Sequence, residues 1–344
     1  MRWKKTLQVV DVHCEGEIGK VITSTTLTVP GTTMLEKLAY INEVDDSLRR
    51  MVCFEPRGFA QMSVNLLVPP TRPDADAGFI VLQPDRAHPM SGSNAICVTT
   101  ALLETGMIPM QEPRTILRLD TAAGLVCVTA DCREGKVESV SLDMSMSFVE
   151  ALDIEVETAR FGNVKVDVAF GGCYYGLITV DQIGLTIEPQ NAQALVQAGI
   201  EILASLSERV KVQHPDHAQI NYFSYVMFRQ FEASGVVRTC TVLRPGRIDR
   251  SPCGTGSSAN LACMQARGLV KPGDVLTSKS IIGSTFRVEL TDLVPFHDKV
   301  GVLPRVTGRG WIYGFSQLAI DPSDPFQRGF CLSDTWGPGI DGLL

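Results

Sequence analysis

Pro89-Met90-Ser91-Gly92-Ser93-Asn94 has a counterpart later in the chain, Pro252-Cys253-Gly254-Thr255-Gly256-Ser257. In both copies a turn containing proline precedes a small nucleophilic residue, Ser91 or Cys253, and a glycine follows that residue directly. A stretch of helix-forming residues, about four turns long, comes next in each copy. The repeat predicts two related halves, each with a helix that begins at a serine or a cysteine.

Each of these predicted helices ends at a glycine, Gly106 in the first copy and Gly268 in the second. Glycine suits the left-handed position that follows the last helical turn. The beginning of a helix carries unpaired backbone N–H groups and about half a positive charge. Two such N-termini that face each other would bind a small carboxylate, and Ser91 and Cys253 would then lie on opposite sides of it.

The composition indicates a globular protein, and a small-molecule partner is expected from the family resemblance given below. The 344 residues suggest two domains, and the net charge of −7 argues against a nucleic-acid surface. The beginning of the sequence has no signal-peptide core, and no apolar run approaches the roughly 20 residues of a membrane span. Ten cysteines without a CxxC pair indicate reduced thiols, so a cytoplasmic protein without a membrane partner is expected.

The hydrophobic pattern predicts an α/β chain that is rich in strands. Strands are expected at residues 7–13, 21–29, 61–68, 79–82, 164–170, 177–180, 221–229, 236–243, 275–290 and 300–306, with a hairpin at 116–130. Helices are expected at 33–50 and 189–212, in addition to the two that follow Ser91 and Cys253. The order strands, helix, strands, helix therefore occurs twice.

This order predicts the domain organisation. Residues 1–155 would form an N-terminal half that carries the Ser91 helix, and residues 156–315 would form a C-terminal half that carries the Cys253 helix. The remaining residues, 316–344, are rich in glycine, proline and aspartate and would pack back on the halves.

Ser91 and Cys253 are the candidate catalytic residues. A helix N-terminus lowers the pKa of a thiol, and Gly254 and Gly256 allow backbone amides to approach a ligand closely. The structural alternatives are a buried cysteine at 253 and a serine at 91 that only caps its helix. The equivalent placement of the two residues favours a functional role for both.

Asp249 and His88 are candidates on weaker grounds. Asp249 comes shortly before Cys253 and could pair with the ammonium group of a substrate, or form a salt bridge with Arg247 or Arg250. His88 comes shortly before Ser91 and could act as a base or lie in a solvated loop. Both alternatives stay open for each residue.

Metal and dinucleotide sites are not predicted. Residues 13–15 and 214–217 contain metal-ligand types, but neither group has a second cluster at a suitable spacing. Residues 254–259 match the pattern GxGxxA, yet the preceding residues do not resemble a strand.

Four segments of the chain together resemble the proline racemase family. They are residues 11–17 (DVHCEGE), 55–58 (EPRG), 90–92 (MSG) and 249–256 (DRSPCGTG). The resemblance covers essentially the full chain, and the last segment is specific. It implies two pseudo-symmetric α/β halves of the diaminopimelate epimerase-like fold, an active site between them, and catalysis without cofactor or metal.

The resemblance also implies roles for individual residues. It assigns acid/base catalysis to Ser91 and Cys253, carboxylate binding to the backbone amides of Gly92, Ser93, Gly254 and Thr255, and contact with the substrate ring nitrogen to Asp249. Members of the family usually carry cysteine at both acid/base positions, so Ser91 is a departure. A neutral serine is a far weaker base than a thiolate, and this favours a reaction that needs one strong base.

The expected activity is therefore removal of the Cα proton of a hydroxyproline. Two outcomes are expected, dehydration of trans-3-hydroxy-L-proline to pyrroline-2-carboxylate and 2-epimerisation of trans-4-hydroxy-L-proline to cis-4-hydroxy-D-proline. The alternatives are a proline racemase, an amino-acid binding protein without catalysis, and a hydrolase that uses Cys253. The oligomeric state is left open, with a homodimer as one option.

Overall fold

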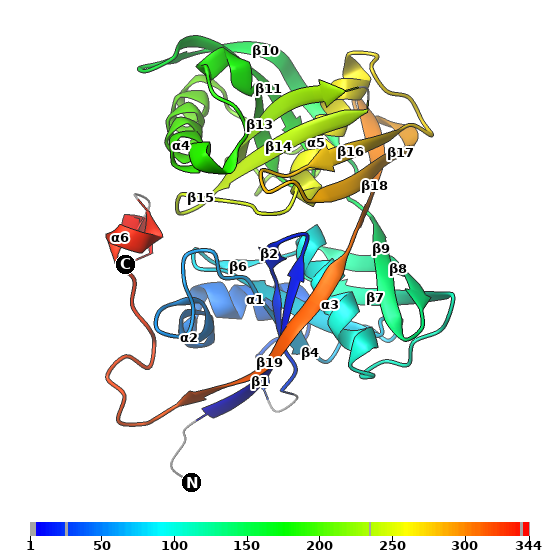
Figure 1. Ribbon diagram of the computed structural model, residues 1–344, viewed down its shortest axis with the longest axis vertical. Helices are drawn as coiled ribbons and strands as arrows, with labels where there is room; N and C mark the ends of the chain where they lie inside the picture. Colours follow the sequence, from blue (N-terminus) through cyan, green and yellow to red (C-terminus); the bar gives the residue numbers. More distant parts are fainter. Residues whose placement is uncertain (1–4, 25–26, 234, 338–339, 344) are drawn as a thin grey trace. The chain divides into compact units, whose positions relative to one another are not determined.

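The chain folds into two compact units (Figure 1). The structure is a computed structural model that describes residues 5–24, 27–233, 235–337 and 340–343. Met1–Leu142 and Gly308–Leu344 make up the first unit, and Asp143–Thr307 make up the second. Within the described ranges, no helix combines the length and the apolar character needed to cross a membrane.

The described residues of the first unit contain strands, three helices of seven to 13 residues and a short C-terminal helix. Its elements are β1 (Lys5–Cys14), β2 (Glu17–Ile18), β3 (Lys20–Ile22), α1 (Met34–Glu43), α2 (Ser47–Cys53), β4 (Val64–Val68), β5 (Ala77–Leu82), β6 (Ala87–His88), α3 (Gly92–Glu104), β7 (Arg114–Thr121), β8 (Gly124–Arg133), β9 (Lys136–Asp143), β19 (Gly310–Ile320) and α6 (Ser333–Trp336).

The second unit has two long helices among its strands. Its elements are β10 (Phe148–Thr158), β11 (Gly162–Phe170), β12 (Tyr174–Thr179), the 3₁₀ turns η1 (Val180–Ile183) and η2 (Pro189–Asn191), α4 (Ala192–Arg209), β13 (Phe223–Ala233), β14 (Val236–Leu243), β15 (Arg247–Ile248), α5 (Gly254–Ala266), β16 (Val275–Lys279), β17 (Thr285–Phe296) and β18 (Lys299–Gly308).

The two units share one order of strand pairing. In the first unit β1–β3 is antiparallel, β3–β4 parallel, β4–β5 antiparallel and β5–β7 parallel. In the second unit β11–β12, β12–β13, β13–β14 and β14–β16 follow the same alternation. The helix α3 precedes β7 as α5 precedes β16. The fold therefore contains the repeat that the two sequence patterns predicted.

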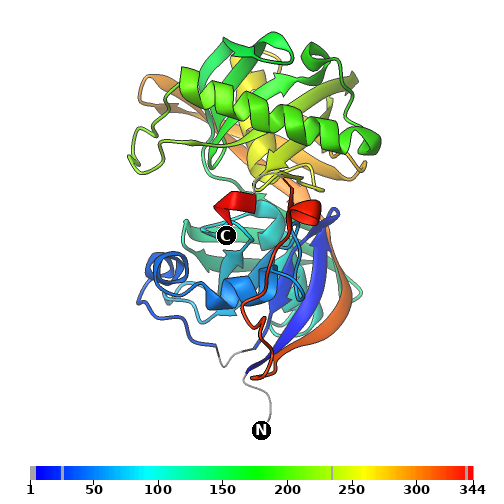
Figure 2. The ribbon, with the colours of Figure 1, turned by 90° about the vertical axis from the view of Figure 1, so that its left-hand side faces the viewer.

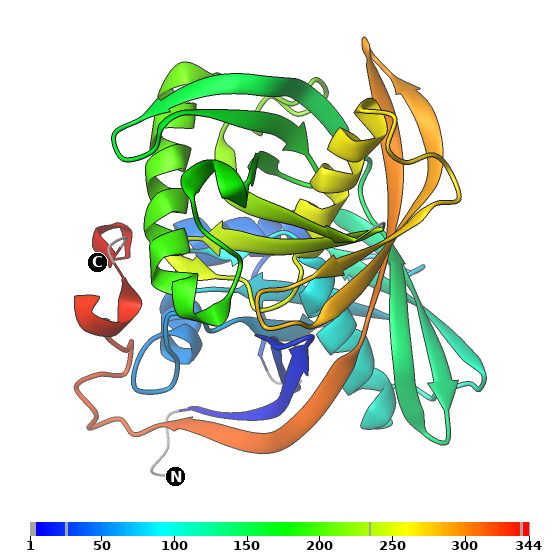
Figure 3. The same ribbon diagram turned by 45° about the horizontal axis from the view of Figure 1, so that its top comes forward.

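In the second unit α4 and α5 cover opposite faces of the strands (Figures 2 and 3). Because side chains alternate along a strand, Tyr174 and Ile178 of β12 pack in the core beneath α4. Tyr175 and Leu177 point the other way and pack with Cys253 and other residues near α5. This alternation decides which side chains of β12 can reach the beginning of α5.

In the first unit α3 is the counterpart of α5. It packs on β1 and β19, and all its residues from Gly92 to Leu103 are buried. Both helices span 13 residues, close to the four turns predicted from the sequence. The glycines that follow them, Gly106 and Gly268, have φ angles of 72° and 71°, which confirms their predicted left-handed conformation.

The predicted helix at 33–50 is wrong, because two helices replace it. The helix α1 begins at a Thr33 cap, whose side chain accepts the backbone N–H of Glu36, and ends before Val44. The Asp45 carboxylate then accepts the backbone N–H of Ser47 at 3.0 Å. Aspartate side chains compete in this way for backbone groups that a continuous helix would use, so the chain turns before α2 begins.

Other expected elements are present with different bounds. The hairpin of β7 and β8 and the long helix α4 confirm the predictions at 116–130 and 189–212. The strand expected at 21–29 is shorter, because β3 ends at Ile22, and residues 25–26 lie outside the described part of the chain.

The boundaries of the compact units differ from those expected at 155/156 and 315/316. Residues 148–158 form β10, which pairs with β11 and so belongs to the second unit. Residues from Gly308 onward belong to the first unit, because β19 pairs with β1 along ten positions from Lys5 to Cys14 (Figure 1). The predicted tail is therefore an integral part of the first unit's strands and core.

Candidate active site

Ser91 stands at the start of α3, where its backbone caps the helix and its hydroxyl does not. The residue is extended, with φ −149° and ψ 133°, and its carbonyl accepts the backbone N–H of Ala95 at 2.9 Å. The hydroxyl makes no capping hydrogen bond. Its Oγ accepts a hydrogen bond from Asn94 Nδ2 at 3.0 Å and lies 3.2 Å from Ser93 Oγ. The structure therefore disfavours the alternative in which the Ser91 hydroxyl serves only as a cap.

Asn94 is held so that its amino group must face Ser91. The Asn94 Oδ1 atom accepts hydrogen bonds from Asn65 Nδ2 at 2.9 Å and Ser63 Oγ at 3.0 Å. An amide with its oxygen occupied in this way presents its N–H₂ group to the remaining neighbour. In the sequence Asn94 is marked only as a polar residue among apolar ones at the start of a predicted helix.

Cys253 occupies the equivalent position at the start of α5, in a different backbone conformation. Its φ of 63° and ψ of 103° lie in a region that is costly for residues other than glycine. The turn before it is braced by Asp249, whose Oδ1 accepts both the backbone N–H and the hydroxyl of Ser251 at 2.8 Å. The Ser251 Oγ in turn accepts the Cys253 N–H at 3.2 Å. Asp249 therefore shapes the corner that carries the thiol.

Burial raises the pKa of the Cys253 thiol to about 12, and the negative charge of Asp249 adds to this effect. The Tyr175 hydroxyl acts in the opposite direction. The side chain is only 5% exposed, so the cost of desolvating a thiolate exceeds the stabilisation by the helix N-terminus. The lowered pKa expected for Cys253 from its helix position is therefore wrong, because burial and Asp249 outweigh the helix N-terminus.

The structure places a tyrosine beside the thiol that the sequence did not indicate. Tyr175 Oη lies 3.4 Å from Cys253 Sγ and 2.7 Å from Thr255 Oγ1. The distance from Cys253 Sγ to Thr255 Oγ1 is 3.8 Å. The three polar atoms thus form a cluster at the beginning of α5, on the face of β12 that points away from α4.

The residues expected to bind a carboxylate are the first residues of the two helices. Gly92 and Ser93 begin α3, and Gly254 and Thr255 begin α5. The N–H groups at the start of a helix lack partners within that helix and carry the positive end of its dipole. Each unit therefore offers one anion-binding N-terminus. That both act on one substrate stays a prediction.

The remaining residues that the sequence pointed to make local contacts. His88 Nε2 lies 3.1 Å from Asp85 Oδ1, so the histidine is engaged in a local pair. Arg57, from the family-like segment 55–58, donates hydrogen bonds to the carbonyls of Phe326 and Gln327 and so holds the C-terminal segment. Among the described residues, no group of three His, Cys, Asp or Glu side chains could hold a metal ion.

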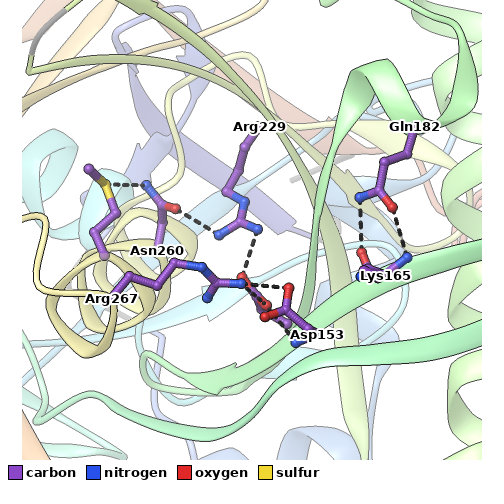
Figure 4. Close-up of polar contacts among 8 residues, drawn as sticks. Asp153, Lys165, Gln182, Arg229, Asn260 and Arg267 are labelled. Atoms are coloured by element: carbon purple, nitrogen blue, oxygen red, sulfur yellow. Dashed lines mark hydrogen bonds and ion pairs between the residues drawn. The ribbon is translucent and has the colours of Figure 1, made fainter.

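The far end of α5 is fixed to the strands by charged side chains, of which Arg229 and Asp167 are buried (Figure 4). Arg229 of β13 donates to Asp167 of β11 at 2.8 Å, and Arg267 after α5 donates to the same carboxylate at 3.0 Å. Asn260 of α5 accepts a hydrogen bond from Arg229 at 3.3 Å, and Asp153 also pairs with Arg267 at 2.8 Å. These contacts hold the helix that carries Cys253 against its sheet.

Distant solved structures confirm the predicted fold class. A PhzF-family phenazine biosynthesis protein from Bacillus anthracis superimposes with a TM-score of 0.60 over 92% of this chain and all of its own, at 11% identity. A likeness at this identity concerns the fold alone.

Close relatives carry names that agree with the predicted chemistry. A 4-hydroxyproline 2-epimerase from Rhizobium etli is 54% identical over 98% of this chain and 99% of its own. The crystal structure of a hydroxyproline epimerase from Agrobacterium vitis, with bound trans-4-hydroxy-L-proline, is 52% identical, covers 99% of both chains and has a TM-score of 0.93. A probable proline racemase from Agrobacterium radiobacter K84, with bound carbonate, has a TM-score of 0.90 at 51% identity, over 96% of this chain and 98% of its own.

These relatives are enzymes, which confirms the prediction that the chain is one. The family model described as proline racemase matches residues 9–331, and this range includes all four segments on which the resemblance rested. The chain therefore belongs to the proline racemase family.

Proposed function

We propose that this protein is a 4-hydroxyproline 2-epimerase that interconverts trans-4-hydroxy-L-proline and cis-4-hydroxy-D-proline. The observation that carries the proposal is the match to the Agrobacterium vitis epimerase, which binds trans-4-hydroxy-L-proline and aligns with 99% of this chain. The two helix N-termini, each beginning at an acid/base candidate, support it.

The substrate carboxylate would bind the backbone amides of Gly92, Ser93, Gly254 and Thr255. When the Cα proton leaves, the electron pair spreads into this carboxylate and its negative charge grows. Preorganised N–H donors stabilise such a developing charge, because they need no reorganisation during the reaction.

Cys253 would remove the Cα proton, and the substrate itself would prepare it for this step. Asp249 raises the pKa of the thiol through its negative charge. A ring ammonium beside Asp249 offsets that charge, so the pKa of Cys253 falls when the substrate binds. The thiolate then takes the proton from Cα, and the thiol forms again.

Ser91 would deliver a proton to the opposite face of Cα. The hydrogen bond from Asn94 Nδ2 to Ser91 Oγ stabilises the negative charge that develops on the oxygen as its proton leaves. Ser93 Oγ, at 3.2 Å, offers a path by which solvent restores the Ser91 proton. Inversion therefore needs both residues, whereas proton exchange on one face needs Cys253 alone.

Dehydration of trans-3-hydroxy-L-proline is a second candidate activity, favoured by the hydroxyl at position 91. After Cys253 removes the Cα proton, hydroxide leaves from the adjacent carbon and a double bond forms. The product tautomerises to pyrroline-2-carboxylate. This reaction requires one strong base, so the weak basicity of Ser91 does not hinder it.

We also infer a reducing compartment, and therefore the cytoplasm, from the cysteines. All ten lie in described residues, and the structure joins none of them in a disulfide. Disulfides form and persist in oxidising compartments, so a chain with ten cysteines and no disulfide among its described residues suits the cytoplasm.

Incubation with each hydroxyproline in D₂O tests the proposal. We expect trans-4-hydroxy-L-proline to gain deuterium at Cα, which NMR measures, and to give cis-4-hydroxy-D-proline, which chiral chromatography measures. Cys253→Ala should lower the rate by roughly 10²–10⁴-fold or more, since it removes the only strong base. Formation of pyrroline-2-carboxylate from trans-3-hydroxy-L-proline would show that the protein also has the dehydratase activity.

The matched control is Cys127→Ala, which removes an exposed thiol of β8 and should leave the rate unchanged. A wild-type protein that leaves the Cα proton of 4-hydroxyproline in place would contradict the proposed function. So would a Cys253→Ala variant of full activity.

A further inference from the structure

Tyr175 lies beside Cys253 but has no role in the reaction proposed above. Its hydroxyl lies within hydrogen-bond distance of Cys253 Sγ, at 3.4 Å, and of Thr255 Oγ1, at 2.7 Å. The side chain is 0% exposed, in the middle of three paired strands, β11, β12 and β13. A polar atom buried this deeply is costly unless it is hydrogen-bonded, so its partners define its role.

The packing around Tyr175 leaves its ring little freedom. The ring contacts Tyr225 of the neighbouring strand, with 5.7 Å between centroids. Gly256 lies close to the same ring: an added Cβ there would come within 3.2 Å of both the Tyr175 ring and Cys253 Sγ, and within 2.3 Å of Met227 Cε. The absence of a side chain at Gly256 therefore lets the tyrosine and the sulfur approach each other.

The direction of the hydrogen bonds depends on the proton of Cys253. A thiolate only accepts hydrogen bonds, so Tyr175 must donate to it and must accept from the Thr255 hydroxyl. A protonated thiol can instead donate to Tyr175, which then donates to Thr255. The short chain from Thr255 through Tyr175 to Cys253 thus fits both forms of the sulfur by rotating two hydroxyl groups.

Tyr175 itself stays a neutral phenol in both forms. Burial raises the pKa of Tyr175 well above its usual range, and the nearby thiols of Cys173 and Cys253 add to this effect. The hydroxyl therefore keeps its proton at any working pH and remains a donor. The described groups that face the cluster include Asp249 before α5, Cys173 before β12, Thr241 of β14 and Thr255 within α5.

We infer that Tyr175 is a positioning residue for Cys253. The Tyr175 hydroxyl donates a hydrogen bond to the Cys253 thiolate and holds the sulfur in place for proton transfer at Cα. The role in proton transfer rests on the proposed function; the hydrogen bond to the sulfur does not. Thr255 supports this donor through its own hydroxyl, and its backbone N–H is one of the groups expected to bind the substrate carboxylate. Carboxylate binding and the state of the sulfur would therefore be coupled through one residue.

The variant Tyr175→Phe tests the inference, because it keeps the ring and removes only the hydroxyl. A hydrogen bond to a charged group is strong enough that its loss lowers the thiolate fraction roughly tenfold or more. We therefore expect iodoacetamide to alkylate Cys253 at least about tenfold more slowly at each pH between about 7 and 9, where thiolate is the reacting form. Peptide mapping by mass spectrometry separates Cys253 from the exposed Cys127 and half-buried Cys173.

The control is Tyr174→Phe, the same change one residue earlier. Tyr174 packs in the core beneath α4, on the opposite face of β12, so its loss should leave the alkylation rate of Cys253 unchanged. In the turnover assay, Tyr175→Phe should lower kcat about tenfold and change KM less, with the thermal midpoint close to that of Tyr174→Phe.

Alkylation of Tyr175→Phe at the wild-type rate would overturn the inference. If this variant does not fold, replacement of Tyr175 by 3-fluorotyrosine tests the inference instead. This replacement keeps the shape of the tyrosine side chain and makes its phenol a stronger hydrogen-bond donor. It should speed alkylation severalfold, and an unchanged rate would overturn the inference. The alkylation assay contains no hydroxyproline, so its outcome is separate from the outcome of the proposed function.

Discussion

At the scale of single residues, the two acid/base candidates receive the same kind of support from different sources. Ser91 accepts a hydrogen bond from Asn94, which lies on the same helix. Cys253 has Tyr175 beside it, a residue from a strand far away in the sequence. The position equivalent to Asn94 in the second copy is Gly256, which cannot donate from a side chain. The repeat therefore preserves the two helix N-termini but not the side chains that form hydrogen bonds with Ser91 and Cys253.

Replacement of Asn94 by alanine should impair inversion more than Cα exchange. Without its N–H donor, Ser91 loses the stabilisation of its developing charge, whereas Cys253 can still remove and return a proton on its own face. We expect epimerisation in D₂O to slow by roughly ten- to a hundredfold, since a hydrogen bond to a charged group is lost. The ratio of deuterium exchange to inversion should rise, as measured by NMR and chiral chromatography.

The comparison variant is Asn191→Ala, which removes the same side chain from an exposed turn and should leave this ratio unchanged. Equal slowing of exchange and inversion in Asn94→Ala would show that Asn94 does not act through Ser91.

At the scale of elements, each nucleophile helix is anchored at its far end by charged side chains. In the first unit Lys136 of β9 pairs with Glu104, the last residue of α3, at 3.1 Å. In the second unit Arg267 and Arg229 share the carboxylate of Asp167, which is 2% exposed (Figure 4). A charge buried in this way depends on its partners, because its removal leaves the opposite charges without compensation.

Asp167→Asn should therefore destabilise the protein by about 3–5 kcal/mol, because Arg229 and Arg267 lose their shared carboxylate. Denaturation by urea, followed by circular dichroism, measures this change. The matched variant Asp74→Asn breaks an exposed pair with Arg72 and should change stability little. Equal stability of the two variants would mean that the buried network does not hold α5.

At the scale of the whole molecule, the first unit is made from both ends of the chain. Residues from Gly308 onward add β19 to β1 and then contribute side chains to the first unit's core. Trp336 is 1% exposed, its ring lies 5.0 Å from that of Phe54, and its Nε1 donates to Glu55 Oε1 at 2.6 Å. The segment around Phe54 and Glu55 is thus stabilised by residues more than two hundred positions later in the sequence.

Trp336→Ala should destabilise the first unit by about 3–5 kcal/mol, because a large side chain leaves a cavity in a packed core. Calorimetry would report a lower midpoint for the first unit. Phe326→Ala provides the control, since this aromatic residue of the same segment is 54% exposed and should contribute little. A Trp336→Ala variant that melts like the wild type would show that the C-terminal segment does not support the core.

Local sequence determined much of this protein. Side-chain type and spacing predict the helix N-termini at Ser91 and Cys253, the approximate lengths of these helices and the glycines that end them. Helix ends can be predicted in this way because they depend on residues a few positions apart. The same local patterns identified the family. The break between α1 and α2 does not follow from hydrophobic periodicity, although its cause is also local, because the Asp45 carboxylate competes for a backbone N–H group.

Only the tertiary structure decided which side chains surround Ser91 and Cys253. Tyr175, Asn65 and Ser63 come from strands and loops distant in sequence, and no periodicity places them beside Cys253 or Asn94. The pKa of Cys253 is the clearest case. Its helix position alone predicts a lowered value, but burial and the nearby Asp249 raise it. Desolvation and charge depend on every group packed around an atom, and that environment exists only once the chain has folded.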